Sequence, residues 1–121
     1  MSKETIQSII QWHTETFPNA TLEGQLQKFE DEKQEYADEN EKNFLSDATL
    51  MELADLIIVA CGIARFDMLQ GMNALYFALR VAYAHSFFVP EVFAEAVQQK
   101  MEINRKRKWS IGKGNYQHVN D

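Results

Sequence analysis

Acidic residues recur at helical spacing in two segments of the chain. Residues 30–39 hold six acids, among them Glu32 and Glu35, whereas residues 48–66 hold only Glu52 and Asp55. Each of these two pairs is separated by three positions, so on a helix both carboxylates of a pair lie on one face. If the two helices are antiparallel and face each other, four carboxylates converge on one point.

Two interpretations of these acids are open. The acidic run at 30–39 is by itself typical of a solvated helix face. The second pair is embedded in an apolar segment, and carboxylates there are rarely buried without compensation. A position near the helix start explains Glu52 better than Asp55. Two unit charges 5 Å apart repel by roughly 3 kcal/mol at an effective dielectric near 20, so a cluster of four is expected to take up protons or bind cations.

The donor types indicate which cation such a cluster would bind. Ligand sets made only of oxygen select hard ions, which favours Mg²⁺, with Mn²⁺ as the second choice. A di-iron bundle site needs a Glu-x-x-His motif on two helices, and neither acidic pair has a His at that spacing. His13, His85 and His118 share no ligand motif, so zinc is also disfavoured.

Positive charge gathers near the C-terminus. Lys100, Asn104 and Arg107 fall at positions i, i+4 and i+7, which is one stripe along a helix. Lys offers a point charge and Arg a planar fork for phosphate oxygens, although cations are also favourable at any helix C-terminus. The net charge of −6 argues against a general nucleic-acid binder, and no P-loop is present. The two features together predict a site for a metal-bound polyphosphate.

These segments match the motifs of a known family. The chain reads DEKQE at 31–35, ELAD at 52–55 and KMEINRKRKW at 100–109. In this order they resemble the EExxE…ExxD signature and the KxxxNxxR segment of the MazG-like nucleoside triphosphate pyrophosphohydrolases, over about residues 10–118. The resemblance implies that the Mg²⁺ ligands are Glu32, Glu35, Glu52 and Asp55. It also implies that the triphosphate is contacted by Lys100, Asn104 and Arg107. Asp31 stands where the family has Glu.

The resemblance implies hydrolysis of (d)NTPs between the α and β phosphates, giving (d)NMP and pyrophosphate, for nucleotide-pool sanitation or dNTP control. Asp31 or Glu32 is the expected acceptor of the water proton. Trp12, His13 and Phe17 are expected to form a pocket for the base. The tail is the alternative, with Trp109, Tyr116 and His118 closing over the nucleotide. Two other readings remain open: a nucleotide- or partner-binding module without hydrolysis, and a structural helical oligomer.

The elements that must position these residues are expected to be helices. No segment alternates like a strand, and a chain of 121 residues with 45% hydrophobic and 25% charged residues is typical of one soluble domain. Periodicity predicts five helices in an up-and-down bundle, at about 3–16, 22–43, 48–66, 72–85 and 90–108. Thr21 and Ser46 or Asp47 are the predicted caps, Gly71 a break, and 109–121 a loop or tail.

The surroundings of this single domain, residues 1–121, are also predicted. Cys61 alone cannot form an intramolecular disulfide, no apolar stretch is long enough to span a bilayer, and no signal peptide is apparent, so we expect a cytoplasmic protein without a membrane or stable nucleic-acid partner. Apolar residues in the fourth predicted helix and after it favour completion of the bundle as a homodimer or homotetramer: Leu75, Tyr76, Leu79, Tyr83, Phe87 and Phe88.

Overall fold

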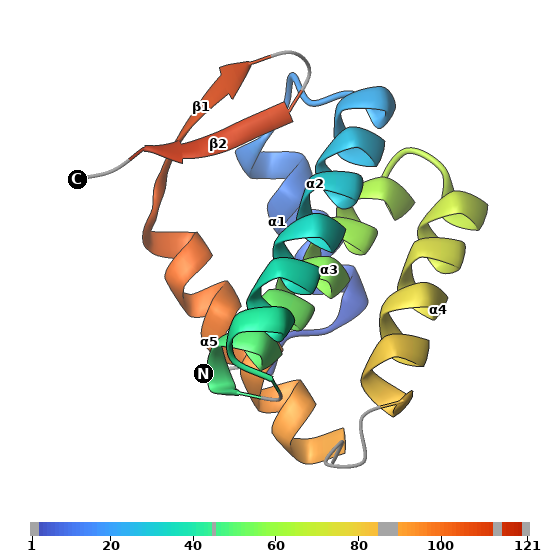
Figure 1. Cartoon of the computed structure of the whole chain (residues 1–121). Coiled ribbons are helices and arrows are strands. Elements are labelled where there is room, and N and C mark those ends of the chain that lie inside the picture. Colours follow the sequence, from blue (N-terminus) through green and yellow to red (C-terminus); the bar gives the residue numbers. More distant parts are fainter. Residues whose placement is uncertain (1–2, 45, 85–89, 113–114, 120–121) are drawn as a thin grey trace.

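Five helices and one β-hairpin make up the described part of the chain (Figure 1). The computed structural model describes residues 3–44, 46–84, 90–112 and 115–119. The helices are α1 (Ile6–Thr16), α2 (Leu22–Lys42), α3 (Asp47–Ala64), α4 (Met68–Ala84) and α5 (Pro90–Lys106), and the strands are β1 (Lys108–Gly112) and β2 (Asn115–Val119). The predicted all-α bundle of about five helices is confirmed. Among the described residues, no helix is both long and apolar enough to cross a membrane.

Hydroxyl side chains set the first residue of three helices. The predicted caps Thr21 and Ser46 accept hydrogen bonds from the backbone of Gly24 and Thr49 at the starts of α2 and α3. Helix α1 begins three residues later than predicted, because Thr5 is extended and forms a reciprocal capping box with Ser8. Such caps satisfy backbone N–H groups that have no partner within the first helical turn.

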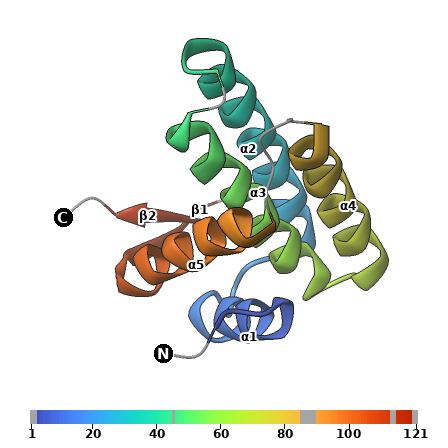
Figure 2. The same ribbon diagram turned by 90° about the horizontal axis from the view of Figure 1, so that it is seen from below.

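Helix α3 is the centre of the bundle. Helices α2 to α5 alternate in direction along the chain (Figure 1), and α1, α2, α4 and α5 all contact α3 from different sides (Figure 2). Twelve of the 18 residues of α3 are buried, so it is apolar nearly all round, as predicted. The two carboxylates that interrupt this apolar sequence therefore come from the most enclosed helix of the molecule.

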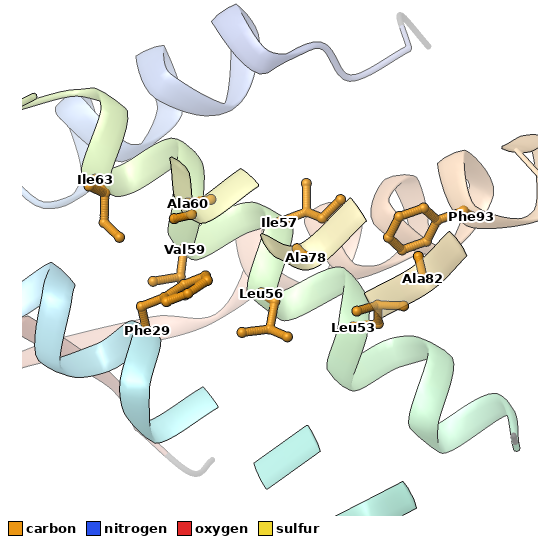
Figure 3. Packing of buried hydrophobic residues seen from close by; sticks show 11 residues of the cluster. Phe29, Leu53, Leu56, Ile57, Val59, Ala60, Ile63, Ala78, Ala82 and Phe93 are labelled. Atoms are coloured by element: carbon orange, nitrogen blue, oxygen red, sulfur yellow. The ribbon is translucent and has the colours of Figure 1, made fainter. Parts of the chain in front are cut away.

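Two apolar clusters hold the helices together. The larger one lines α3 from Leu53 to Ile63, and Figure 3 shows Phe29 of α2 and Phe93 of α5 joining it from different helices. The smaller one attaches α1 and α5 to the other side of α3, and contains Ile9, Trp12, Phe17, Ala20, Ile58, Cys61 and Met101. The candidate functional residues lie between α2, α3 and α5, and both clusters keep these helices at fixed separations.

The predicted break at Gly71 is wrong. Helix α4 begins at Met68, four residues earlier than expected, and Gly71 lies inside its first turn. A Cβ atom at this position would lie 2.4 Å from Cα of Ala64, so the glycine permits close contact between α4 and the end of α3. Close packing therefore outweighs the low helix propensity of glycine. The predicted end of this helix, His85, lies outside the described residues, as do Phe87 and Phe88.

The prediction that residues 109–121 form a loop or tail is also wrong for the described residues of that segment, 109–112 and 115–119. Strands β1 and β2 pair in antiparallel register from Lys108 opposite Val119 to Gly112 opposite Asn115. Strands of five residues are too short to give a clear alternating pattern in the sequence, and they are stabilised by pairing with each other and by contact with the body. Helix α5 accordingly ends at Lys106, two residues earlier than predicted, and β2 also contacts α2.

Candidate functional site

A cavity of about 310 Å³ opens between α1, α2, α3, α5 and the hairpin. Its wall has three chemically different parts: carboxylates, cations, and a group of aromatic and amide side chains. The polar and aromatic residues that line it are Trp12, His13, Phe17, Gln25, Lys28, Glu32, Glu35, Glu52, Asp55, Lys100, Asn104, Arg107, Trp109 and His118. Every predicted site residue is in this group except Asp31 and Tyr116, and the side chain of Tyr116 is not among those that the structure describes.

Three carboxylates converge at one end of the cavity. Glu32 of α2 and Glu52 and Asp55 of α3 each offer one oxygen, and these oxygens lie within 4.8 Å of one another. The spacing of three places Glu52 and Asp55 on the side of α3 that faces α2. Glu35, the fourth predicted ligand, lines the same cavity but is exposed and stands outside this group of three.

Enclosure makes the negative charge of these carboxylates costly. Burial, followed by the charge of Asp55 and the hydrogen bond that protonated Glu32 donates to Glu35, raises the pKa of Glu32 to about 9. Burial and the same Asp55 charge raise the pKa of Glu52 to about 7. Burial also raises the pKa of Asp55, against the opposing effect of Lys100. The cluster therefore favours a bound proton or cation over three bare charges.

Two carboxylate oxygens in this cluster have no partner. Oε2 of Glu32 and Oε2 of Glu52 are buried, and neither accepts a hydrogen bond from any described residue. Buried polar atoms are normally satisfied, so an unsatisfied pair beside a third carboxylate needs an explanation. Hard divalent cations prefer such oxygen donors, and the residues present fit a magnesium or manganese ion.

Cations border the carboxylates on two sides. Nζ of Lys100 lies 3.4 Å from Oδ2 of Asp55, and Nζ of Lys28 lies 3.9 Å from Oε1 of Glu32. Arg107 follows α5 and donates to Oδ1 of the buried Asn104 at 3.4 Å. The stripe of three predicted on α5 is thus directed at the cavity, and it gives an anionic ligand contacts next to the carboxylates.

Aromatic rings form another part of the cavity wall. Phe17 packs edge-to-face against Trp12 and Trp109, with ring centroids 5.1 Å and 5.0 Å apart. Nε1 of Trp109 donates to the backbone oxygen of Asn104 at 3.3 Å, which ties β1 to α5. The ring of His118 on β2 stands 6.1 Å from that of Trp109, while the side chain of Tyr116 lies outside the described part. The two predicted origins of a base pocket, α1 and the tail, therefore meet in one wall.

Asp31 does not join this site. It is exposed and accepts a hydrogen bond from Nε2 of Gln27 at 3.0 Å, and it is not among the described side chains that line the cavity. One residue along a helix turns the side chain by about 100°, so Asp31 and Glu32 cannot share a face. The predicted catalytic role of Asp31 therefore has no support from its position.

Sequence reasoning missed Gln25 and Lys28. Both line the cavity, and with Glu32 and Glu35 they form a stripe at intervals of three, four and three residues on α2. That stripe was the available signal, because residues at these intervals share a helix face.

The cavity brings carboxylates, cations and flat aromatic rings together within one volume. Such a combination suits a ligand that carries both phosphates and an aromatic ring. Comparisons with family models, curated proteins and solved structures found no match to this chain. The functional argument therefore rests on the geometry of the cavity and on the motifs in the sequence.

Proposed function

We propose that this protein is a magnesium-dependent nucleoside triphosphate pyrophosphohydrolase that cleaves (d)NTPs between the α and β phosphates. The observation that carries the proposal is the convergence of three enclosed carboxylates, two with an unpartnered buried oxygen, beside cations and aromatic rings. A role in nucleotide-pool sanitation or dNTP control, as a homodimer or homotetramer, belongs to the same proposal.

Glu32, Glu52 and Asp55 would hold the Mg²⁺ or Mn²⁺, with Glu35 at the cavity rim. When bound, the ion supplies charge neutralisation of the phosphate oxygens and lowers the pKa of a coordinated water. Of the two expected proton acceptors, Asp31 and Glu32, only Glu32 is among the described residues that line the cavity, so Glu32 is the one that fits.

The cations of the chain would act on the phosphates. Lys100 and Arg107 bind phosphate oxygens and stabilise the charge that develops on the departing pyrophosphate. The ion pair between Lys100 and Asp55 fixes the lysine beside the carboxylate cluster. Lys28 borders the same cluster from α2, so triphosphate oxygens meet positive charge from two helices.

The test is product analysis on a panel of NTPs and dNTPs with Mg²⁺. We expect pyrophosphate and monophosphate, and we expect Glu52→Gln to abolish turnover while the fold survives. The matched control is Glu41→Gln, which neutralises an exposed acid of α2 far along the helix from the cavity and should keep wild-type turnover. Orthophosphate and diphosphate as products, or full activity in Glu52→Gln, would contradict the proposal. Binding without any product would favour the non-hydrolysing module.

A further inference from the structure

A chain of three polar side chains leads from the end of α3 to the aromatic part of the cavity. Nη1 of Arg65, the residue that follows α3, lies 3.1 Å from Nδ1 of His13. Nε2 of the same His13 lies 3.1 Å from Oε1 of Gln25. His13 and Gln25 are 3% and 2% exposed, so neither can exchange these partners for bulk water.

The chemistry of these groups fixes the direction of each hydrogen bond. A guanidinium only donates, so Nδ1 of His13 must accept from Arg65. The ring is neutral, because burial lowers the pKa of His13 to about 4. In a neutral ring with Nδ1 accepting, Nε2 carries the proton and donates to Gln25. The amide of Gln25 must therefore present its oxygen to His13.

The nitrogen side of the Gln25 amide is left for a ligand in the cavity. The described side-chain hydrogen bond of Gln25 uses Oε1, and a Cβ atom at Gly62 would lie 2.8 Å from that oxygen and 2.7 Å from Nε2 of His13. The backbone of α3 therefore closes off the oxygen side of the pair. Since Gln25 lines the cavity, its amide nitrogen provides two N–H donors there.

The position of Gln25 along α2 suits a nucleobase. Gln25 and Glu32 are seven residues apart on one face, which separates them by about 10 Å along the axis. A nucleotide with its phosphates at the carboxylates would extend past the aromatic wall and bring the polar edge of its base to Gln25. This placement rests on the proposed function.

We propose that Gln25 selects bases with a keto oxygen at that edge, namely guanine, hypoxanthine, uracil or thymine, by donating a hydrogen bond from its amide nitrogen. Arg65 and His13 are positioning residues that fix the direction of the amide, because Arg65 does not line the cavity and both ring nitrogens of His13 are engaged by Arg65 and Gln25. An amino group at the same ring position is itself a hydrogen-bond donor, so it would meet the N–H of Gln25 and no hydrogen bond would form between them. Buried sites that leave polar groups unpaired in this way discriminate strongly.

Matched nucleotide pairs test the role of Gln25. ITP and ATP differ at the exocyclic group of carbon 6, and UTP and CTP differ at carbon 4. For each pair that the protein hydrolyses, we expect kcat/KM to be about tenfold or more higher for the keto member than for the amino member. Gln25→Glu replaces the amide donor with an acceptor oxygen, so it should favour the amino member. Equal kcat/KM values within the pairs, or an unchanged preference in Gln25→Glu, would overturn the proposal.

Nitrogen-15 NMR of His13 tests the positioning role. The wild-type ring should carry its proton on Nε2 and not on Nδ1, and a proton on Nδ1 would overturn the proposal. Arg65→Met should mix the tautomers and reduce the keto preference, chiefly through a higher KM for keto substrates, whereas Arg65→Lys should restore both. Arg80→Met, at an exposed site on α4, is the control and should change neither.

Calorimetry with non-hydrolysable ITP and ATP analogues separates this inference from the proposed function. Tighter binding of the ITP analogue, reversed in Gln25→Glu, supports the inference even if no nucleotide is hydrolysed. Turnover combined with equal affinities supports the function and overturns the inference. Binding of neither analogue contradicts both.

Discussion

At single residues of the carboxylate cluster, the burial that favours cation binding lowers the stability of the metal-free protein. In the folded protein, burial raises the pKa of Glu32 from its ordinary value of 4.5 to about 9. Between these two values the folded state binds more protons than the unfolded state, so stability falls as pH rises. The same enclosure that makes the bare charge unfavourable makes an added cation favourable.

Glu32→Gln is therefore expected to stabilise the metal-free protein at pH 8. The substitution removes a group whose ionisation opposes folding, and we expect a gain of at least about 1 kcal/mol in the free energy of unfolding. In the wild type, millimolar Mg²⁺ should raise Tm, because the ion binds the folded cluster only, and this shift should be lost in the variant. Urea unfolding from pH 5 to pH 8 with a chelator, repeated with Mg²⁺, measures both effects. A wild type as stable at pH 8 as at pH 5 would contradict the explanation.

Gly62 is expected to be intolerant of any side chain. Its Cβ would lie within 3 Å of both His13 and Gln25, so these buried side chains would have to leave their hydrogen-bonded positions. Gly62→Ala should cost about 1–3 kcal/mol of stability through overpacking. It should also loosen the hydrogen bond between His13 and Gln25. Thermal unfolding measures the first effect and the ¹⁵N signals of His13 the second, while a retained Mg²⁺-induced shift in Tm would show that the carboxylate cluster is intact.

How far the site could be predicted depends on the kind of residue. Glu52 and Asp55 stand out because charge in an apolar helix is rare, and this rarity is visible without a structure. Gln25 and Arg65 are ordinary in their local sequence. They become identifiable as functional candidates only because both contact His13, from which they are 12 and 52 positions away. Sequence spacing within one helix could have found Gln25, but no local pattern identifies Arg65.

At the scale of elements, α4 carries two different faces. Small residues at intervals of three or four face α3 and are buried: Gly71, Ala74, Ala78 and Ala82. Large residues at similar intervals form an outward stripe, which consists of Leu69, Met72, Tyr76, Leu79 and Tyr83. The periodicity predicted the helix, yet it could not separate a packing glycine from a break, because that depends on how closely α3 approaches.

Gly71→Ala tests the close contact between α3 and α4. The added methyl would lie 2.4 Å from both Cα and Cβ of Ala64, and the backbone atom cannot move aside independently. Although alanine favours helices, we expect a net loss of about 1–3 kcal/mol in stability, measured by urea unfolding. Asn73→Ala, an exposed position on the same helix, is the control and should be neutral or slightly stabilising. A stabilised Gly71→Ala protein would mean that the two helices are farther apart.

At the scale of the whole molecule, the outward stripe of α4 leaves apolar surface uncovered. Leu69 is 72% exposed and Leu79 is 41% exposed, and the five positions repeat at alternating intervals of three and four as in helix–helix seams. Contiguous apolar patches of this kind mark interaction sites. We propose that a second copy of the chain covers this stripe, in agreement with the oligomer expected from the sequence.

Charge placed in the stripe should therefore separate the copies. The wild type is expected to sediment as at least a dimer, with twice the chain mass of 14.0 kDa or more, at micromolar concentration. Leu69→Lys combined with Leu79→Lys should shift it to the monomer, because two buried, unpaired cations per copy would oppose association. Asn73→Lys adds the same charge to an exposed position outside the stripe and should leave the assembly intact. A monomeric wild type would exclude the interface, whereas a monomeric double variant that retains the Mg²⁺-induced shift in Tm would place the carboxylate site within a single chain.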